Sequence, residues 1–70
     1  MITDEKILIE LGNQFKAARE LARLKQSEVA EAAGINANYY AQIERGEVNT
    51  SFDKVYRIAK ALNLDDIKIK

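Results

Sequence analysis

The chain has 70 residues, enough for one domain with one core and too few for a second domain. It contains no cysteine and no histidine, which excludes a disulfide framework and a zinc site built from the usual nitrogen and sulfur ligands. Eleven basic residues balance 11 acidic ones, so the net charge by itself argues against nucleic acid.

The first predicted helix begins near Thr3, the expected N-cap, with Asp4 and Glu5 in its first turn. Its apolar residues recur at steps of three and four and form one stripe: Leu8, Leu11, Phe15, Ala18 and Ala22. Gly12 costs this helix about 1 kcal/mol relative to alanine. We therefore interpret Gly12 as a point where another element approaches closely.

The second predicted helix, Gln26 to Ala33, is about two turns long and ends at Gly34. Three apolar residues of this helix should face inward: Val29, Ala30 and Ala33. Its start departs from the usual pattern, because Lys25 stands where a serine, threonine, aspartate or asparagine cap is expected.

The third predicted helix has Asn36 as its N-cap and Gly46 at its end, with Ile35 packing on Tyr40 as a hydrophobic staple. Tyr40 and Ile43 should point inward. The opposite side carries a stripe that is uncharged until its last turn: Asn38, Ala41, Gln42 and Arg45.

A fourth helix is capped by Thr50 or Ser51, with Asp53 in its first turn. Its predicted inward residues are Phe52, Val55, Ile58, Ala59 and Leu62. Residues 63–70 fit either a final helical turn or a strand. The chain is therefore predicted to be all-α.

Basic residues gather in one part of the sequence. The run from Lys16 to Lys25 contains four of them against Glu20 alone, whereas acidic residues lie toward both ends. Two short helices joined by a tight glycine turn also form a helix-turn-helix arrangement, whose second helix can enter the major groove of DNA. Asn38 and Gln42 lie four residues apart on one face, where amides can pair with adenine, and Ala37 can contact a thymine methyl group.

Four short motifs strengthen this interpretation: Gln-Ser-Glu-Val-Ala at 26–30, Gly34-Ile35, Tyr39, and Ile-Glu-Arg-Gly at 43–46. In these motifs and their spacing, residues 11–64 resemble the lambda-repressor-like helix-turn-helix regulators, which include phage repressors and Cro proteins. The resemblance implies a single domain over residues 1–70, folded as a compact bundle of four to five helices. It also implies a small transcriptional regulator or repressor that binds double-stranded DNA.

The resemblance assigns roles to individual residues. It implies base-reading roles for Ala37, Asn38 and Gln42. Five residues are candidates for phosphate contacts: Lys25, Gln26, Asn36, Tyr39 and Arg45. Arg19 and Glu44 match a pair that forms a structural salt bridge in several members, and this pair should tie the first helix to the end of the base-reading helix.

The sequence departs from the family at two places. Tyr40 stands where a branched aliphatic residue is usual, so its hydroxyl group needs water or a partner if the ring is buried. Glu47 and Asn49 occupy a loop that often supplies basic phosphate contacts in DNA-binding members. Together with the zero net charge, this loop lowers the expected affinity for DNA.

An enzyme is the least expected class, and no cofactor or metal is expected, because the chain lacks nucleophile, base and phosphate-loop patterns. The alternative function is a protein-interaction module, such as an antitoxin, that keeps the fold with weak or secondary DNA binding. A DNA-binding protein should surround the amide stripe with four cations: Lys16, Arg23, Lys25 and Arg45.

Two expectations concern assembly and location. Spare apolar residues at both ends favour a homodimer on a palindromic site: Ile2, Ile7, Ile9, Ile67 and Ile69. The longest early apolar stretch is too short for a signal peptide or a membrane span, so a cytoplasmic protein is expected. The operator sequence and the sign of regulation stay open.

Overall fold

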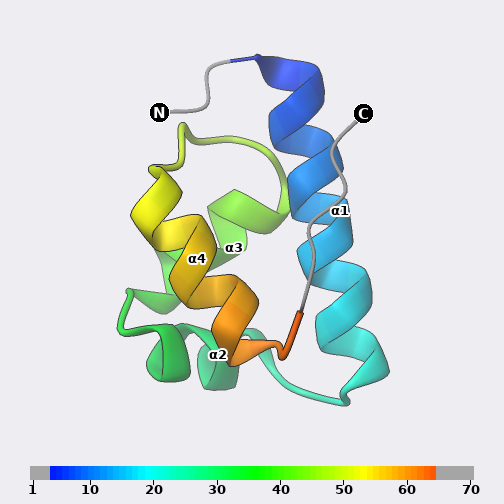
Figure 1. The fold of residues 1–70 in the computed structure, drawn as a ribbon, viewed down its shortest axis with the longest axis vertical. Coiled ribbons are helices and arrows are strands. Elements are labelled where there is room, and N and C mark those ends of the chain that lie inside the picture. Colours follow the sequence, from blue (N-terminus) through cyan, green and yellow to red (C-terminus); the bar gives the residue numbers. More distant parts are fainter. Residues whose placement is uncertain (1–3, 65–70) are drawn as a thin grey trace.

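The computed structural model describes residues 4–64, which fold into four α-helices around one core (Figure 1). The helices are α1 (Glu5–Leu21), α2 (Gln26–Ala33), α3 (Ala37–Glu44) and α4 (Phe52–Ala61). α1 packs against α3, and α2 packs against both α3 and α4. This arrangement confirms the predicted all-α bundle. Of the residues with an open assignment, 63–70, only 63 and 64 are described, and they follow the end of α4 as turn and irregular backbone, while 65–70 lie outside the described part. None of the helices within residues 4–64 is long and apolar enough to cross a lipid bilayer.

The helix starts follow the expected capping chemistry, with one correction. Asp4, and not Thr3, caps α1, because its side chain accepts hydrogen bonds from the backbone N–H groups of Lys6 and Ile7. Asn36 caps α3 as predicted, and Ser51 rather than Thr50 caps α4. Thr50 is instead buried, with its hydroxyl group directed to the carbonyl of Val48.

The unusual start of α2 is stabilised from inside the helix. Lys25 is the N-cap, and its backbone N–H donates to the side chain of Glu28 at 2.7 Å. This contact is the half of a capping box that does not require a polar side chain at the cap itself. The helix ends at Gly34 in the left-handed conformation, with φ +73°, so that the chain turns directly into α3.

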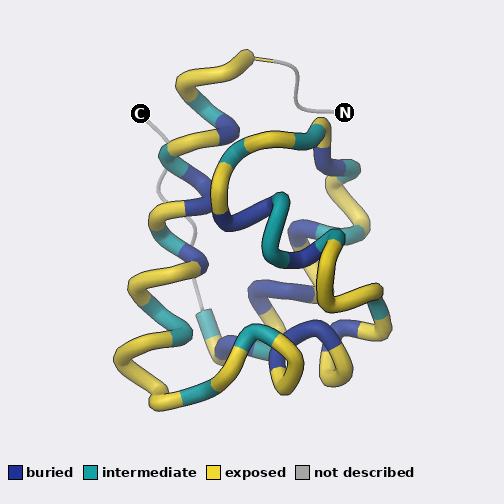
Figure 2. The backbone as a smooth tube through the Cα atoms, turned by 180° about the vertical axis from the view of Figure 1, so that it is seen from behind, coloured by how far each residue is buried: buried dark blue, intermediate teal, exposed yellow. Residues whose placement is uncertain are grey.

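The core draws on one side of every helix, as the buried segments in Figure 2 show. It includes the inward residues predicted for α2 and α3, and its largest members are Tyr40, Phe15 and Leu11. Two predicted core residues are exposed. Ala22 lies just beyond the end of α1, where the chain leaves the stripe. Phe52 is 78% exposed because it occupies the first turn of α4, before that helix reaches the core.

Gly12 is the contact point between α1 and α3, so the close approach predicted at this glycine is confirmed. A Cβ atom built on Gly12 would lie 2.4 Å from the carbonyl oxygen of Glu44 and 2.5 Å from that of Ile43. Both oxygens belong to rigid helix backbone, so no side chain fits here. The close approach fixes the C-terminal end of α3 against the middle of α1 and thereby orients the opposite side of α3 toward solvent.

Candidate functional site

The outward side of α3 carries the residues predicted to read bases. Ala37 and Asn38 are exposed, and Gln42 is partly exposed one turn further along. The inward side of the same helix buries Tyr40 and Ile43 completely or nearly so. A helix anchored on one side in this way presents the amide of Asn38 to solvent and leaves that of Gln42 partly accessible.

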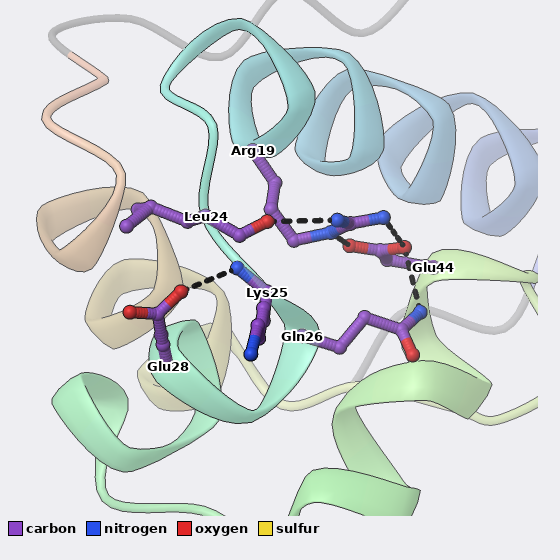
Figure 3. A network of polar contacts seen from close by, with 6 residues as sticks. All are labelled: Arg19, Leu24, Lys25, Gln26, Glu28 and Glu44. Atoms are coloured by element: carbon purple, nitrogen blue, oxygen red, sulfur yellow. Dashed lines mark hydrogen bonds and ion pairs between the residues drawn. The ribbon is translucent and has the colours of Figure 1, made fainter.

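A polar network lies beneath the C-terminal end of α3 (Figure 3). Two guanidinium nitrogens of Arg19 donate to Glu44: Nε to Oε2 at 2.6 Å and Nη2 to Oε1 at 3.2 Å. Arg19 Nη1 donates to the carbonyl of Leu24 at 2.9 Å, and the Gln26 amide donates to Glu44 Oε1 at 2.9 Å. The network joins α1, the α1–α2 turn, α2 and α3, so it sets the position of α3 relative to the start of α2.

Burial and pairing act in opposite directions on Glu44, whose side chain is only 2% exposed. Burial opposes its ionisation, but the hydrogen bonds from Arg19 and Gln26 outweigh burial and lower the pKa of Glu44 below its usual value. The hydrogen bond to Glu44 raises the pKa of Arg19. Both groups are therefore charged at neutral pH, and the predicted structural pair is present in the folded protein.

Tyr40 brings an unusual hydroxyl group next to this network. The side chain is fully buried, and within residues 4–64 its hydroxyl group has no hydrogen-bond partner. Burial raises the pKa of Tyr40, and the negative charge of Glu44 raises it further, so the phenol stays neutral. Glu44 thus lies close enough to act on this hydroxyl group, although no hydrogen bond of acceptable geometry joins the two within residues 4–64.

A polar groove borders α3 at its C-terminal end. It is lined by residues of α1, of the α2 start and of the end of α3: Asn13, Lys16, Arg19, Lys25, Gln26, Glu44 and Arg45. Arg19 and Glu44 neutralise each other at its base, whereas Lys16 and Lys25 are exposed at its rim. Arg23 is exposed at the end of α1 and is not among the lining residues, so three of the four expected cations meet here.

Arg45 does not present a free guanidinium to this groove. Its Nε and Nη2 donate to the two carboxylate oxygens of Glu47 at 2.9 and 3.1 Å. Both side chains are about half exposed, and the hydrogen bond from Arg45 lowers the pKa of Glu47. The loop acid noted in the sequence therefore contacts the cation that was expected to meet phosphate.

The other two candidate phosphate contacts lie at the opposite end of α3. A hollow between the α2–α3 turn and α4 contains Asn36 and Tyr39 together with Lys54 and Arg57 of α4. The Tyr39 hydroxyl group donates to the carbonyl of Asn49 at 3.3 Å, and Lys54 Nζ lies 5.7 Å from the centre of the Tyr39 ring. The five candidates thus form two groups, one at each end of the helix.

Three features of the site were not predicted from the sequence. Asn13 and Lys54 come from helices whose outward faces carry no motif, and the contact of Gln26 with Glu44 joins residues 18 positions apart. Only the helical register of Lys54 relative to buried Val55 and Ile58 could have placed it on an exposed side. No group of three or more potential metal ligands occurs in the part of the chain described here.

Residues 15–67 match the helix-turn-helix family. The chain is 39% identical over 56 residues to the ImmF control region 10 kDa protein of Bacillus phage phi105, a match covering 80% of this chain and 62% of that protein. It is 33% identical over 55 residues to an HTH-type transcriptional regulator of Sinorhizobium fredii, covering 79% of this chain and 28% of the relative. The chain thus spans less than two thirds of the length of either relative.

The fold also matches a solved structure. The restriction-modification controller protein C.AhdI from Aeromonas hydrophila superposes with a TM-score of 0.80 at 28% sequence identity. The match covers 83% of this chain and 88% of that one. Nearly the whole described bundle is therefore common to both proteins.

Proposed function

Because the chain belongs to the helix-turn-helix family, we propose that it is a transcriptional regulator that binds double-stranded DNA, with α3 in the major groove. The curated relatives support this assignment, since their names describe an HTH-type transcriptional regulator, an immunity repressor and the control protein C.SmaI. We expect the protein to act in the cytoplasm, where its DNA partner is accessible.

The observation that carries the proposal is the open outward side of α3. Asn38 is exposed, and Gln42, one helical turn further along, is partly exposed. Amides at this spacing can each form two hydrogen bonds with the major-groove edge of adenine. Ala37 at the start of the helix is exposed and can meet a thymine methyl group.

The groups at the two ends of α3 then serve as phosphate contacts. The groove at the C-terminal end of α3 is bordered by Lys25, Gln26 and Arg45. The hollow at the N-terminal end of α3 contains Asn36 and Tyr39. Such contacts set the register of the protein on the duplex but carry no base information. The paired Arg19 and Glu44 hold the helix in position beneath this surface without touching DNA.

The alternative of a protein-interaction module predicts a neutral or acidic surface around the amides. Lys16 and Lys25 at the groove rim favour DNA instead, and the carboxylate that pairs with Arg45 within residues 4–64 is that of Glu47. We therefore retain DNA binding as the single function.

We further propose a homodimer that binds a palindromic site, because one recognition helix covers few base pairs. Exposed apolar side chains on α1 and α4 are available for an interface: Ile9, Phe52 and Tyr56. Analytical ultracentrifugation should show a dimer at micromolar protein or on palindromic DNA. Only monomer under both conditions would remove the dimer from the proposal.

The experiment that tests DNA binding is selection of bound duplexes from a random pool, followed by binding measurements over a salt series. Affinity should fall as salt rises while the preference for the selected sequence persists. Asn38→Ala and Gln42→Ala should each relax the preference at their own base pair by about 1 to 3 kcal/mol. Glu31→Ala, on an exposed position of α2 away from this surface, is the control.

Failure of the selection to enrich any sequence would refute the proposed function. Enrichment with an unchanged preference in both amide variants would refute the base-reading roles alone.

A further inference from the structure

Lys54 is the most distinctive cation outside the groove already described. We propose that Lys54, held over the ring of Tyr39, binds a DNA phosphate at the N-terminal end of α3, and that this phosphate lies on the strand opposite to the one met by Lys25. The inference rests on the proposed DNA binding, and it adds a contact residue on a helix that no motif marks.

The first argument is charge. The hollow between the α2–α3 turn and α4 is lined by Gly34, Ile35, Asn36, Tyr39, Lys54 and Arg57, which include two cations and no acid. Arg57 is paired with Asp53 at 3.2 Å. Within residues 4–64 no ion pair joins Lys54 to a carboxylate, so Lys54 is the uncompensated charge of the hollow.

The second argument is preorganisation. The Tyr39 hydroxyl group is bound to the carbonyl of Asn49, which restrains the ring, and the ring in turn attracts the Lys54 ammonium at 5.7 Å. A lysine side chain held in this way loses less conformational freedom on binding than a free one. An ammonium group resting on an aromatic face still has N–H donors directed away from the ring, which suits a phosphate oxygen.

The third argument is position. Asn36 caps α3, so the hollow opens at the start of this helix, whereas Lys25, Gln26 and Arg45 border its other end. A helix of eight residues is about 12 Å long, and the major groove is about 12 Å wide. The length of α3 is therefore comparable to the width of the groove, which lets cations near its two ends reach phosphates on the two sides.

The chain offers a matched control in Lys60. This lysine is also on α4 and also lies 5.7 Å from the centre of a tyrosine ring, that of Tyr56, but it borders a different hollow away from the α3 surface. Lys54→Gln and Lys60→Gln remove the same charge and the same type of ring contact. Lys54→Arg keeps the charge and serves as the conservative variant.

The experiment measures binding of the four proteins to the duplex enriched by selection, over a salt series, with thermal unfolding as a check on folding. Lys54→Gln should lower the salt slope by about 0.9, which corresponds to roughly an eightfold loss of affinity near 0.1 M salt. Sequence preference should stay unchanged, since a phosphate contact reads no base. Lys60→Gln should match the wild type, and Lys54→Arg should recover most of the affinity.

Ethylation interference locates the phosphate. Ethylation of one phosphate should weaken binding of the wild type but not of Lys54→Gln. The phosphate whose ethylation no longer weakens binding of Lys25→Gln should lie on the other strand. An unchanged slope in Lys54→Gln, or an equal loss in Lys60→Gln, would overturn the contact, and both phosphates on one strand would overturn the spanning geometry. If the wild type binds no duplex, the proposed function fails first and this inference with it, whereas wild-type binding with an inert Lys54 refutes this inference alone.

Discussion

Glu44 and Arg45 are neighbours in the chain, and each forms an ion pair, but the surroundings of the two pairs differ. Glu44 is 2% exposed and meets Arg19 of a distant helix, with Gln26 supplying a further hydrogen bond. Arg45 is 55% exposed and meets Glu47 two residues later. The buried pair positions α3 against α1, while the exposed pair lies on the surface that we assign to DNA.

The comparison teaches that similar contacts serve different ends according to burial. In the buried pair, loss of one partner leaves a buried charge without its counterion, so removing either partner alone should destabilise the fold. In the exposed pair, either partner returns to water at little cost, so the pair can open when a phosphate approaches. Substitutions in both pairs, a change of pH and a substitution of the neighbouring Tyr40 test this contrast.

Removal of Arg19 should have the largest effect. Arg19→Ala leaves the Glu44 carboxylate buried and unpaired, and we expect the free energy of unfolding to fall by about 3 to 5 kcal/mol. Denaturant unfolding measures the loss, with Arg45→Ala as the matched control that should leave stability almost unchanged. A loss below about 1 kcal/mol for Arg19→Ala would erase the distinction between the two pairs.

If Arg19→Ala is too unstable to measure, a double variant still tests the same point. Arg19→Met with Glu44→Leu removes both charges together and should be more stable than Arg19→Ala, because no buried charge is left alone. A double variant as unstable as the single one would show that the pair acts through packing and not through charge.

Low pH should reduce the free energy of unfolding by less than Arg19→Ala does, because a protonated Glu44 carries no charge and still fills its space. The pKa of Glu44 is lower in the folded protein than its ordinary value of 4.5, so its ionisation adds stability above that pH. This contribution disappears as the pH falls below 4.5 and passes through the folded-state value. Denaturant unfolding between about pH 6 and pH 3 should show a weaker acid dependence in Glu44→Gln than in the wild type.

Glu47→Gln is the control for the acid experiment. Its carboxylate is half exposed, so its removal should leave most of the acid dependence in place. Equal flattening by both variants would mean that burial does not distinguish the two carboxylates.

Tyr40→Phe should raise the free energy of unfolding by about 1 kcal/mol. The hydroxyl group of Tyr40 is desolvated without a partner in the described structure, and its removal relieves that penalty while the ring continues to fill the core. Thermal or denaturant unfolding measures the change, with Tyr56→Phe on the exposed side of α4 as the control. Destabilisation by Tyr40→Phe would indicate that the hydroxyl group contributes a hydrogen bond to the Arg19–Glu44 network.

Glu47→Gln should have the smallest effect, leaving the free energy of unfolding almost unchanged. It should nevertheless strengthen DNA binding by up to about fivefold, because Arg45 no longer has to leave an exposed pair before it meets phosphate. The salt slope should change little, because Arg45 meets the same phosphate in the wild type once its pair with Glu47 opens. Unchanged affinity in Glu47→Gln would show that Arg45 does not meet phosphate.

The fold was largely predictable because it depends on local patterns. The stripe through Leu8, Leu11 and Phe15 gave the buried side of α1, and Asn36 and Gly34 correctly marked a helix start and a helix end. The errors fell at element ends. Phe52 continues the apolar spacing of α4, but the first turn of that helix projects beyond the core, which no periodicity can show.

The sequence by itself determined the four helices and the amide-bearing side of α3, because capping and periodicity act over short ranges. The match between Arg19 and Glu44, which are 25 residues apart, came from the resemblance to the family. Only the tertiary structure decided that Gly12 touches the end of α3, that Tyr40 lacks a partner, and that Lys54 lies over Tyr39. These contacts join helices far apart in the chain, and their existence depends on packing distances of a few ångströms that no local pattern encodes.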